Sequence, residues 1–331
     1  MDELCYRVSE EGDLPDLLRL WEEAGWGRLA PRQWREWFVD GPQGPSLITV
    51  AVDAAGEVVA LEVFAAARLS VAGREVRALR CSAPILRPDL RGQSLRRAAH
   101  PAWGLYRAAA AVAAEHGFEV GYSLPYHAWL PILRNAHRFG LPRFAITAFG
   151  CAELPLEPAS EPASERFARG VETRPVASFG AEHEALWHAA RESFPIACGV
   201  VRDAAWLSFR NSGRIALEVR DREGGLVGYS ATTRQTGLLA DLLARRPEEL
   251  TAVVAATARW LAGERRPGEP GDLTHLKAMR TPALDPALLA LGFTPVDYRF
   301  GFICNTYGDA AGDESWRARM APERWYVMPG D

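Results

Sequence analysis

The segment whose residue types and spacing point most directly to chemistry is a polar turn within residues 82–112. The apolar run SAPIL ends shortly before Pro88, the turn carries Arg91 and Gly92, and a long helical pattern follows. Backbone N–H groups at a helix start carry partial positive charge, so a phosphate can bind there, and a glycine lets it approach closely. The pattern predicts either an anion site or an edge strand followed by a solvated, arginine-rich helix start.

A glutamate stands inside an apolar strand pattern upstream of this turn. Glu62 lies in the run VVALEVF, and a carboxylate flanked by apolar residues is unusual. Pro84 cannot donate to a β-ladder, which favours a bulge or a separation of strands at that point. If the strands separate, Glu62 faces a cleft and is a candidate general base. A glutamate exposed at a sheet edge explains the pattern equally well.

Charge and cysteine usage narrow the class of protein. The chain has 331 residues and a net charge of −4, which argues against a surface that binds a nucleic-acid backbone, so we expect no DNA partner. Its five cysteines are scattered without a C-x-x-C pair, and its histidines lack ligand spacing, so we expect no metal. No apolar run approaches the roughly 20 residues of a membrane span. We expect a cytoplasmic protein without a membrane partner.

The chain reads as two similar halves. Residues 154–170 repeat Glu-Pro-Ala-Ser and predict a linker between domains at 1–153 and 171–331. Each half gives the order strand, helix, three strands, helix, strand, helix, strand. In the first half, the central helix is expected from Gln93 to His116, closed by Gly117. The fold class predicted is a mixed α/β unit repeated once.

This order of elements resembles the GNAT superfamily of acyl-CoA transferases, in particular the tandem type that includes the FemAB-like aminoacyl transferases. The family's turn after the fourth strand reads roughly Pro-x-x-Arg-Gly-x-Gly-x-Gly/Ala. Here Pro88, Arg91 and Gly92 match, whereas Ser94 and Arg96 replace the later glycines. The runs NAHRFGL, LLALGFTPV and ERWYVMPGD also resemble family segments. The resemblance implies two GNAT-like domains, each with a mixed, mostly antiparallel sheet flanked by helices.

The resemblance also implies a cofactor, acetyl-CoA or another acyl-CoA, with its pyrophosphate on the turn and its pantetheine arm near Pro84. Ser94 keeps a donor, and Arg96 can either clash with the phosphate or pair with it. The second half has no matching turn, so the first half is expected to bind the cofactor. The residues that the resemblance assigns to it are Ile85, Leu86, Arg87, Arg91, Gly92, Gln93, Ser94, Leu95 and Arg96.

For catalysis, the family often uses a strand carboxylate as base and a tyrosine of the last helix as acid. The matching positions here are Ala136 and, in the second half, Leu288, so the usual acid is absent. His137, in a helix expected over residues 127–140, is one substitute, and Tyr126 at the end of a strand is another. A surface histidine and a packed aromatic are the respective alternatives.

Tryptophans between the first helix and the second strand are candidates for binding the acceptor. Trp34 and Trp37 share one helical face, in a region that covers the acceptor in GNAT-like proteins. Their alternative role is core packing. As a substrate site they favour a hydrophobic or ring-bearing amine.

The resemblance thus implies an N-acyltransferase that moves an acyl group, acetyl first, from a CoA thioester to the amine of a small molecule. One alternative is FemAB-like transfer from aminoacyl-tRNA, although the negative net charge opposes it. Another is a repurposed fold that does not acetylate, which the missing tyrosine and altered glycines favour. The sequence does not decide the oligomeric state.

Overall fold

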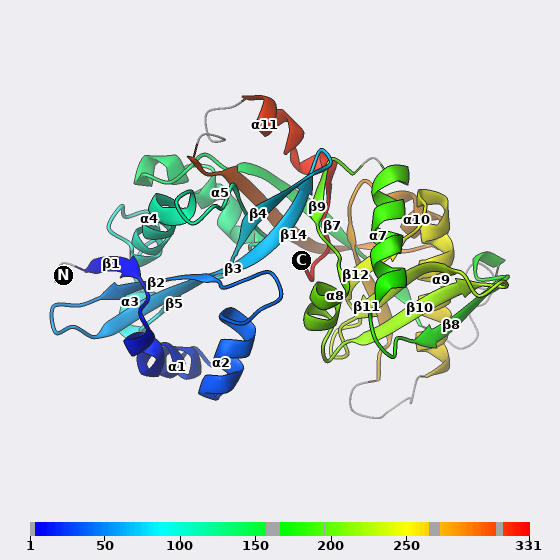
Figure 1. Ribbon diagram of the computed structural model, residues 1–331, viewed down its shortest axis with the longest axis horizontal. Coiled ribbons are helices and arrows are strands. Elements are labelled where there is room, and N and C mark those ends of the chain that lie inside the picture. Colours follow the sequence, from blue (N-terminus) through cyan, green and yellow to red (C-terminus); the bar gives the residue numbers. More distant parts are fainter. Residues whose placement is uncertain (1–3, 157–165, 195, 265–271, 309–313) are drawn as a thin grey trace. The chain divides into compact units, whose positions relative to one another are not determined.

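The computed structural model describes residues 4–156, 166–194, 196–264, 272–308 and 314–331. The chain divides into two compact units (Figure 1). The first comprises Met1–Thr147 with Gly301–Pro322, and the second Ala148–Phe300 with Glu323–Asp331. Both units are therefore built from two separate stretches of the chain.

The first unit follows much of the strand–helix order expected of the first half, with further helices, a two-residue strand and short 3-10 turns added. It ends with a strand that comes from far along the chain. Its elements are β1 (Cys5–Val8), η1 (Glu11–Asp13), α1 (Leu14–Glu23), α2 (Pro31–Phe38), β2 (Leu47–Val52), β3 (Val58–Val71), β4 (Arg74–Cys81), β5 (Ile85–Leu86), α3 (Pro88–Arg91), α4 (Pro101–Ala113), β6 (Val120–Ser123), η2 (His127–Trp129), α5 (Leu130–Leu133), η3 (Ala136–Phe139), the end of β14 (Thr294–Thr306) and α11 (Glu314–Arg319).

The second unit repeats much of this order. Strand β7 enters it from the first unit. Its elements are β7 (Ala145–Pro155), β8 (Val171–Pro175), α7 (Ala181–Ser193), β9 (Cys198–Val200), α8 (Ala204–Arg210), β10 (Ile215–Asp221), β11 (Leu226–Thr232), β12 (Leu239–Ala244), η4 (Pro247–Glu249), α9 (Leu250–Gly263), β13 (His275–Arg280), α10 (Asp285–Ala290), the start of β14, η6 (Pro322–Arg324, at the boundary between the units) and β15 (Trp325–Tyr326).

The observed units differ from the predicted domains at 1–153 and 171–331. The end of β14 belongs to the first unit, where it pairs with β6. The predicted linker starts inside β7, whose pairing with β13 extends to Pro155. The middle of that linker, residues 157–165, lies outside the described residues. A strand late in the sequence completes the first unit, which a division at a linker cannot anticipate.

The first unit contains a mixed, mostly antiparallel sheet. Strands β1, β2, β3 and β4 pair antiparallel in that order, β4 pairs parallel with β6, and β6 pairs antiparallel with β14. On one face, Leu61 and Val63 of β3 pack with side chains of α1 and α2. On the other face, Ala60 and Phe64 pack with side chains of α4 (Figure 1). The predicted sheet flanked by helices is confirmed.

The central helix is shorter than predicted. It was expected from Gln93 but α4 begins at Pro101, with His100 as N-cap in extended conformation. A residue before proline is disfavoured in the helical region, and proline is favoured at the first helical position, so this pair sets the helix start. Gly117 adopts φ +76°, as expected of a residue that ends a helix. The helix expected over 127–140 is also broken, since only α5 is α-helical there and 3-10 turns flank it.

The second unit holds a four-stranded antiparallel sheet in the order β12, β11, β10, β8. A fully buried cation, Arg202, contacts β12 of this sheet: it donates to Asp241 of that strand at 3.1 Å and to Asp331 at 2.8 and 2.9 Å. Its guanidinium also lies 5.5 Å from the ring centre of Trp187 and 5.3 Å from that of Tyr326. Such a buried cluster is stable only while all its charges are paired.

No helix among the described residues is long and apolar enough to cross a membrane. Within the same described part of the chain, no group of three or more His, Cys, Asp and Glu side chains is arranged to hold a metal ion.

Candidate active site

A break between β4 and β5 opens the sheet of the first unit. Phe64 pairs with Cys81 and Leu61 pairs with Ile85, so Ser82, Ala83 and Pro84 face only Glu62 and Val63. The extra residue makes a β-bulge, as Pro84 predicts. The parallel pairing of β4 with β6 runs through Arg80, beside Tyr122, and does not extend to Cys81. The two strands separate from this point.

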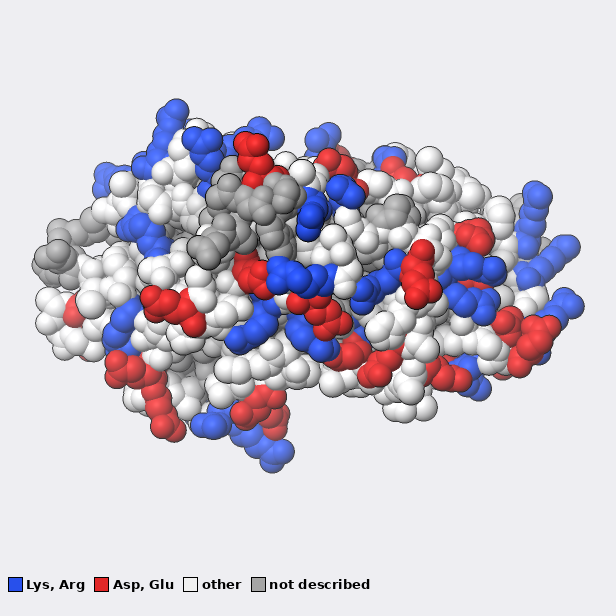
Figure 2. Space-filling view, turned by 45° about the horizontal axis from the view of Figure 1, so that its top comes forward, with Lys and Arg blue, Asp and Glu red and all other residues white. Residues whose placement is uncertain are grey.

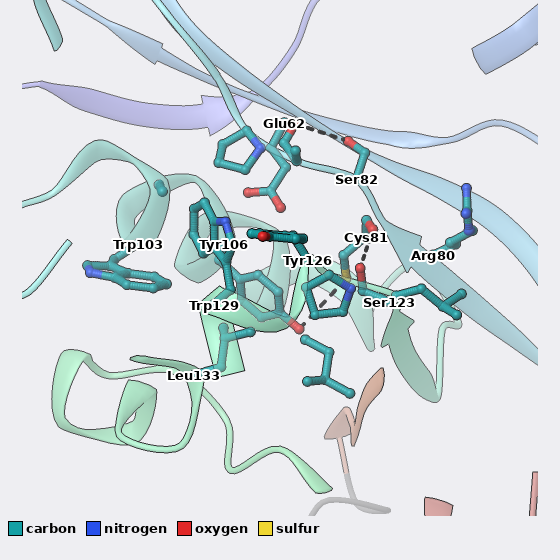
Figure 3. A pocket seen from close by; sticks show the side chains of 16 residues that line it. Glu62, Arg80, Cys81, Ser82, Trp103, Tyr106, Ser123, Tyr126, Trp129 and Leu133 are labelled. Carbon is teal, nitrogen blue, oxygen red and sulfur yellow. Dashed lines mark hydrogen bonds between the residues drawn. The ribbon is translucent and has the colours of Figure 1, made fainter. Parts of the chain in front are cut away.

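A cavity of about 370 Å³ occupies this separation, a volume in the range of small-molecule sites. Its lining residues come from β3, β4, α4, β6, β14 and the segments that follow β4 and β6 (Figure 3). Most of its walls are apolar or aromatic, which excludes water and strengthens charge interactions inside. The apolar and aromatic lining residues are Ala83, Pro84, Ala102, Trp103, Tyr106, Leu124, Pro125, Tyr126, Trp129, Leu133 and Ile303.

Glu62 points into this cavity (Figure 3). Successive residues of a strand face opposite sides of the sheet, and Glu62 shares the α4-facing side with Ala60 and Phe64. It is 4% exposed, and its carboxylate forms no hydrogen bond or ion pair with any described residue. Burial raises the pKa of Glu62 well above its usual value because water no longer stabilises the charged form. A buried carboxyl with a raised pKa in a cleft is a frequent feature of catalytic sites.

Beside Glu62 lies a cluster of buried polar side chains at one end of the cavity. The hydroxyl of Tyr106, on α4, donates to Asn305 Oδ1 at 2.8 Å and accepts from the Cys81 thiol at 3.8 Å. The Tyr307 hydroxyl lies 3.5 Å from that of Tyr106. Burial raises the pKa of Tyr106 and Tyr307 well above the ordinary value, and that of the Cys81 thiol as well. All three groups therefore keep their protons at neutral pH.

Gly121 of β6 makes room for this cluster. A Cβ atom at this position would lie 2.5 Å from the Tyr307 hydroxyl and 2.6 Å from Asn305 Oδ1, both closer than van der Waals contact. The absence of a side chain is thus required by the polar groups and not by the backbone conformation, since Gly121 is not among the glycines with positive φ.

The structure places the other predicted catalytic residues differently. Tyr126 lines the cavity but is 55% exposed, and its ring centre lies 4.4 Å from that of His127. His137 is exposed on η3 and does not line the cavity. Glu62 and Tyr126 are therefore brought together around one cavity, and His137 is not.

The predicted cofactor residues lie beyond the cavity, along the chain that leaves it. Ile85 and Leu86 are buried in β5, and residues 87–96 continue through α3 into an irregular segment. Arg91 braces this segment, because it donates to the Leu86 carbonyl at 2.7 Å and the Glu23 carbonyl at 3.1 Å. The turn therefore does not start the central helix, contrary to the prediction.

Other members of the predicted set also have defined surroundings. Arg87 forms ion pairs with Asp53 and Asp89. The Leu95 carbonyl accepts from the Trp103 indole at 2.9 Å, which ties the turn to the cavity wall. The Ser94 hydroxyl accepts from the Arg96 amide at 3.3 Å, and Gln93 is half-buried.

The predicted acceptor tryptophans do not line the cavity. Trp34 is buried among side chains of α1, β2 and β3, with its ring centre 5.8 Å from that of Trp21. Trp37 is 44% exposed, and its ring centre lies 6.4 Å from that of Trp21. Trp34 thus has the packing role that was the alternative.

Apart from Tyr126, the aromatic side chains that line the cavity were not predicted. Trp103 and Tyr106 lie on α4, and Trp129 lies on η2. The first two are separated by one helical turn, so their spacing could have shown that they share a face. Nothing in the sequence pairs that face with Asn305 and Tyr307, which arrive from the other end of the chain.

No protein-family model and no curated protein sequence matches the chain. Solved structures do match. A GCN5-related N-acetyltransferase from Kribbella flavida is 18% identical, with a TM-score of 0.58 over 92% of this chain and 71% of that chain. Saccharomyces cerevisiae N-myristoyltransferase with bound myristoyl-CoA and inhibitors is 11% identical, with a TM-score of 0.54 over 92% and 80%. A tandem GNAT protein from the clavulanic acid biosynthesis pathway is 17% identical, with a TM-score of 0.52 over 92% and 99%.

The chain therefore has the mixed α/β fold of GNAT structures, including a tandem GNAT, and the predicted fold class is confirmed. Its structural neighbours are acyltransferases of this fold. At these identities the similarity establishes the fold alone. The FemAB-like part of the resemblance stays a prediction, because none of these three proteins is of that type.

Proposed function

We propose that the first unit is an N-acyltransferase that moves an acyl group, acetyl as first choice, from a CoA thioester to the amine of a small molecule. The observation that carries this proposal is the buried, unpaired carboxylate of Glu62 in an apolar cavity at a break in the sheet. The myristoyl-CoA bound to the N-myristoyltransferase neighbour supports the donor class.

Glu62 has the properties required of the base. Amines are protonated in neutral water, so the amine releases one proton to solvent before it attacks, and the attacking nitrogen must then lose a second proton to a base in forming the amide. A carboxyl with a raised pKa accepts that proton more readily than an exposed carboxylate, because its charged form is less stable. The carboxylate points into the cavity, where a small amine can reach it (Figure 3). The aromatic walls favour an acceptor with an apolar or ring-bearing body.

The turn over Arg91–Arg96 fits the pyrophosphate of the donor. Among the described residues, the backbone amides of Ser94 and Leu95 find no acceptor within the chain, and the side chain of Arg96 is exposed. A Cβ on Gly92 would meet nothing within 4 Å, so the surface there is open. Free amides next to arginines suit an anion. The donor would supply an activated thioester to the cavity.

The alternatives differ in their partners. Figure 2 shows Lys and Arg side chains interspersed with Asp and Glu over the visible face, which supports a small-molecule acceptor over tRNA, since a phosphate backbone favours a continuous basic surface. A repurposed protein without transferase activity would leave Glu62 buried without a partner, at a cost in stability and no benefit.

The test is calorimetric titration with acetyl-CoA, CoA and aminoacyl-tRNA on the wild type and two variants. Gly92→Asp places a carboxylate at the turn, whereas Gly92→Asn places a neutral group of the same size there. The open surroundings and the φ of −76° tolerate both. We expect acetyl-CoA to bind at one site per chain and Gly92→Asp to weaken it more than tenfold beyond Gly92→Asn, a difference of about 1.4 kcal/mol.

Equal affinities of the two variants would remove the turn from the donor site. No binding of either CoA species to the wild type would refute the proposed function and favour the repurposed fold. Once binding is shown, transfer to a panel of arylalkyl and alkyl amines, with acetyl-CoA and longer acyl-CoAs, identifies the acceptor and acyl classes.

A further inference from the structure

Tyr106 lies where the cavity meets the buried polar cluster. Its ring forms part of the cavity wall (Figure 3). Its hydroxyl contacts Asn305, Cys81 and Tyr307. Tyr106 is 6% exposed. A phenylalanine would fill the same space without burying a hydroxyl, so packing alone does not account for a tyrosine here.

The fold makes specific provision for this hydroxyl. Gly121 lacks the side chain that would displace Tyr307 and Asn305. Asn305 and Tyr307 come from the late segment of the chain that completes the first unit, and the Tyr307 amide is fixed by a 2.9 Å hydrogen bond to the Glu119 carbonyl. A buried polar network costs stability unless each member is satisfied, and here its members converge on one oxygen that borders the cavity.

We propose that Tyr106 is the general acid of the reaction, donating its phenolic proton to the sulfur atom that leaves the acyl group. This inference rests on the proposed acyltransferase function. The amine nitrogen forms a bond to the acyl carbon and loses a proton to Glu62, while the carbon–sulfur bond breaks with its electron pair on sulfur. The Tyr106 proton passes to that sulfur, and solvent returns the proton held by Glu62 to the phenolate. The net products are one amide and one thiol.

The surroundings support the transfer. Burial raises the pKa of Tyr106, so its hydroxyl keeps its proton until a thiolate forms, and the apolar cavity likewise raises the pKa of a leaving alkyl thiol above its ordinary value of about 8.5, which favours protonation of the sulfur. The phenolate left behind can accept hydrogen bonds from the Cys81 thiol and the Tyr307 hydroxyl. The titratable groups that face this region are Glu62 of β3, Arg80 and Cys81 of β4, Tyr126 after β6, and Tyr307 after β14.

The assignment differs from both predicted acids. His137 is exposed and outside the cavity, so it cannot reach a group bound there without rearrangement. Tyr126 lines the cavity but is more than half exposed, where water can replace it. Tyr106 combines a place on the cavity with a hydroxyl held by Cys81 of β4, Asn305 of β14 and Tyr307 directly after β14.

The test compares two thioester donors on wild type, Tyr106→Phe, Tyr126→Phe and His137→Gln. An alkyl thioester such as acetyl-CoA needs a proton on its leaving sulfur, whereas a nitrothiophenyl ester of the same acyl group leaves readily without one. We expect Tyr106→Phe to lower kcat about 100-fold or more with acetyl-CoA and less than about tenfold with the aryl thioester. Tyr126→Phe and His137→Gln should lower both rates equally or not at all.

The ratio of the two rates is measured on one preparation, so it does not depend on the fraction of Tyr106→Phe that is folded. Equal losses with both donors would overturn the assignment and leave Tyr106 as a packing residue. A wild type that transfers to no amine would refute the proposed function, and the assignment with it.

A binding measurement gives an independent readout. CoA presents a thiol to the Tyr106 hydroxyl, and desulfo-CoA does not. We expect wild type to bind CoA several-fold more tightly than desulfo-CoA, and Tyr106→Phe to bind both alike. A preference that survives in Tyr106→Phe would place the sulfur away from Tyr106 and overturn the proposal.

Discussion

Replacing Glu62 by glutamine should stabilise the protein while it abolishes transfer. Burial raises the pKa of Glu62 in the folded state, whereas in the unfolded chain it stays near 4.5. Below pH 4.5 both states carry the proton, and Glu62 costs no more than glutamine. Between 4.5 and the raised pKa, the folded state binds more protons than the unfolded state, so stability falls as the pH rises. Glutamine does not ionise, so the stability of the Glu62→Gln variant carries no such loss with rising pH.

The size of the stability difference follows from the difference in bound protons between the folded and the unfolded state. One proton of difference changes the free energy of unfolding by about 1.4 kcal/mol per pH unit. For a domain the size of the first unit, that corresponds to about 3–5 °C in Tm per pH unit. The gap between Glu62→Gln and wild type should therefore widen from pH 4.5 upward and level off at the folded-state pKa of Glu62.

The assay is thermal or urea unfolding of both proteins from pH 4.5 to 9. Glu115→Gln is the matched control, since Glu115 is exposed and the substitution removes one charge without a change in burial. The control should show a flat difference across the range. A Glu62→Gln variant that is less stable than wild type at pH 8 would show that the carboxylate has a stabilising partner, and the reasoning about an unpaired buried acid would fail.

Two further substitutions test the packing on which the site and the second unit depend. Gly121→Ala brings a methyl group to 2.5 Å from the Tyr307 hydroxyl, and should cost about 1–3 kcal/mol in urea unfolding and lower turnover, whereas Gly92→Ala should change stability by less than about 0.5 kcal/mol. Arg202→Met leaves Asp241 and Asp331 buried without their cation, and should cost about 3–5 kcal/mol at pH 8. That cost should shrink toward pH 5, because burial raises the pKa of Asp331 and protonation removes its charge; equal costs at both pH values would contradict this account.

The position of the cavity could be anticipated from local sequence, because its causes are local. Pro84 cannot complete a ladder, so a break in the strand was expected, and the bulge lies at Ser82–Pro84. Glu62 was expected to face a cleft if the strands separate, and the alternation of side chains along β3 places it there. Its role as a base is a proposal. Its location can be predicted from Pro84 and from the alternation of side chains along a strand.

The start of the central helix is also determined by local sequence, but a second local pattern indicates a different start. The helical pattern runs back to Gln93, whereas His100 and Pro101 fix the start of α4. Proline at the first helical position is a known start signal. The turn motif upstream instead favours a start directly after the turn, at Gln93. The donor turn is therefore an irregular segment separate from α4. An anion there would bind to free backbone amides and arginine side chains, and not to a helix N-terminus.

The parts of the site that could not be predicted depend on contacts distant in sequence. Asn305 contacts Tyr106 across 199 residues, more than half of the chain. No periodicity within either segment encodes that pairing. Trp34 shows the converse, because its spacing with Trp37 correctly indicated a shared helical face, but only the tertiary structure shows that Trp34 packs into the core while Trp37 stays exposed.

In the second unit two strands also diverge, but another segment of the chain fills the space between them. Leu238, the residue before β12, forms an isolated parallel bridge with Lys277 of β13. Beyond that bridge, the segment from Tyr326 to Gly330 donates hydrogen bonds to carbonyl groups of β12. The Tyr326 hydroxyl donates to the Leu242 carbonyl at 2.5 Å, and the Gly330 amide donates to the Ala240 carbonyl at 2.7 Å.

A Cβ at Gly330 would lie 2.5 Å from the Ala240 carbonyl, so only glycine allows this approach. Arg202 then fixes Asp331, the next residue, through two hydrogen bonds. In the first unit the corresponding divergence, between β4 and β6, is lined by Glu62 and aromatic side chains. The asymmetry explains why chemistry is expected of one unit: a segment of the chain satisfies the backbone groups along β12, whereas the first unit keeps a buried acid that a bound amine would satisfy.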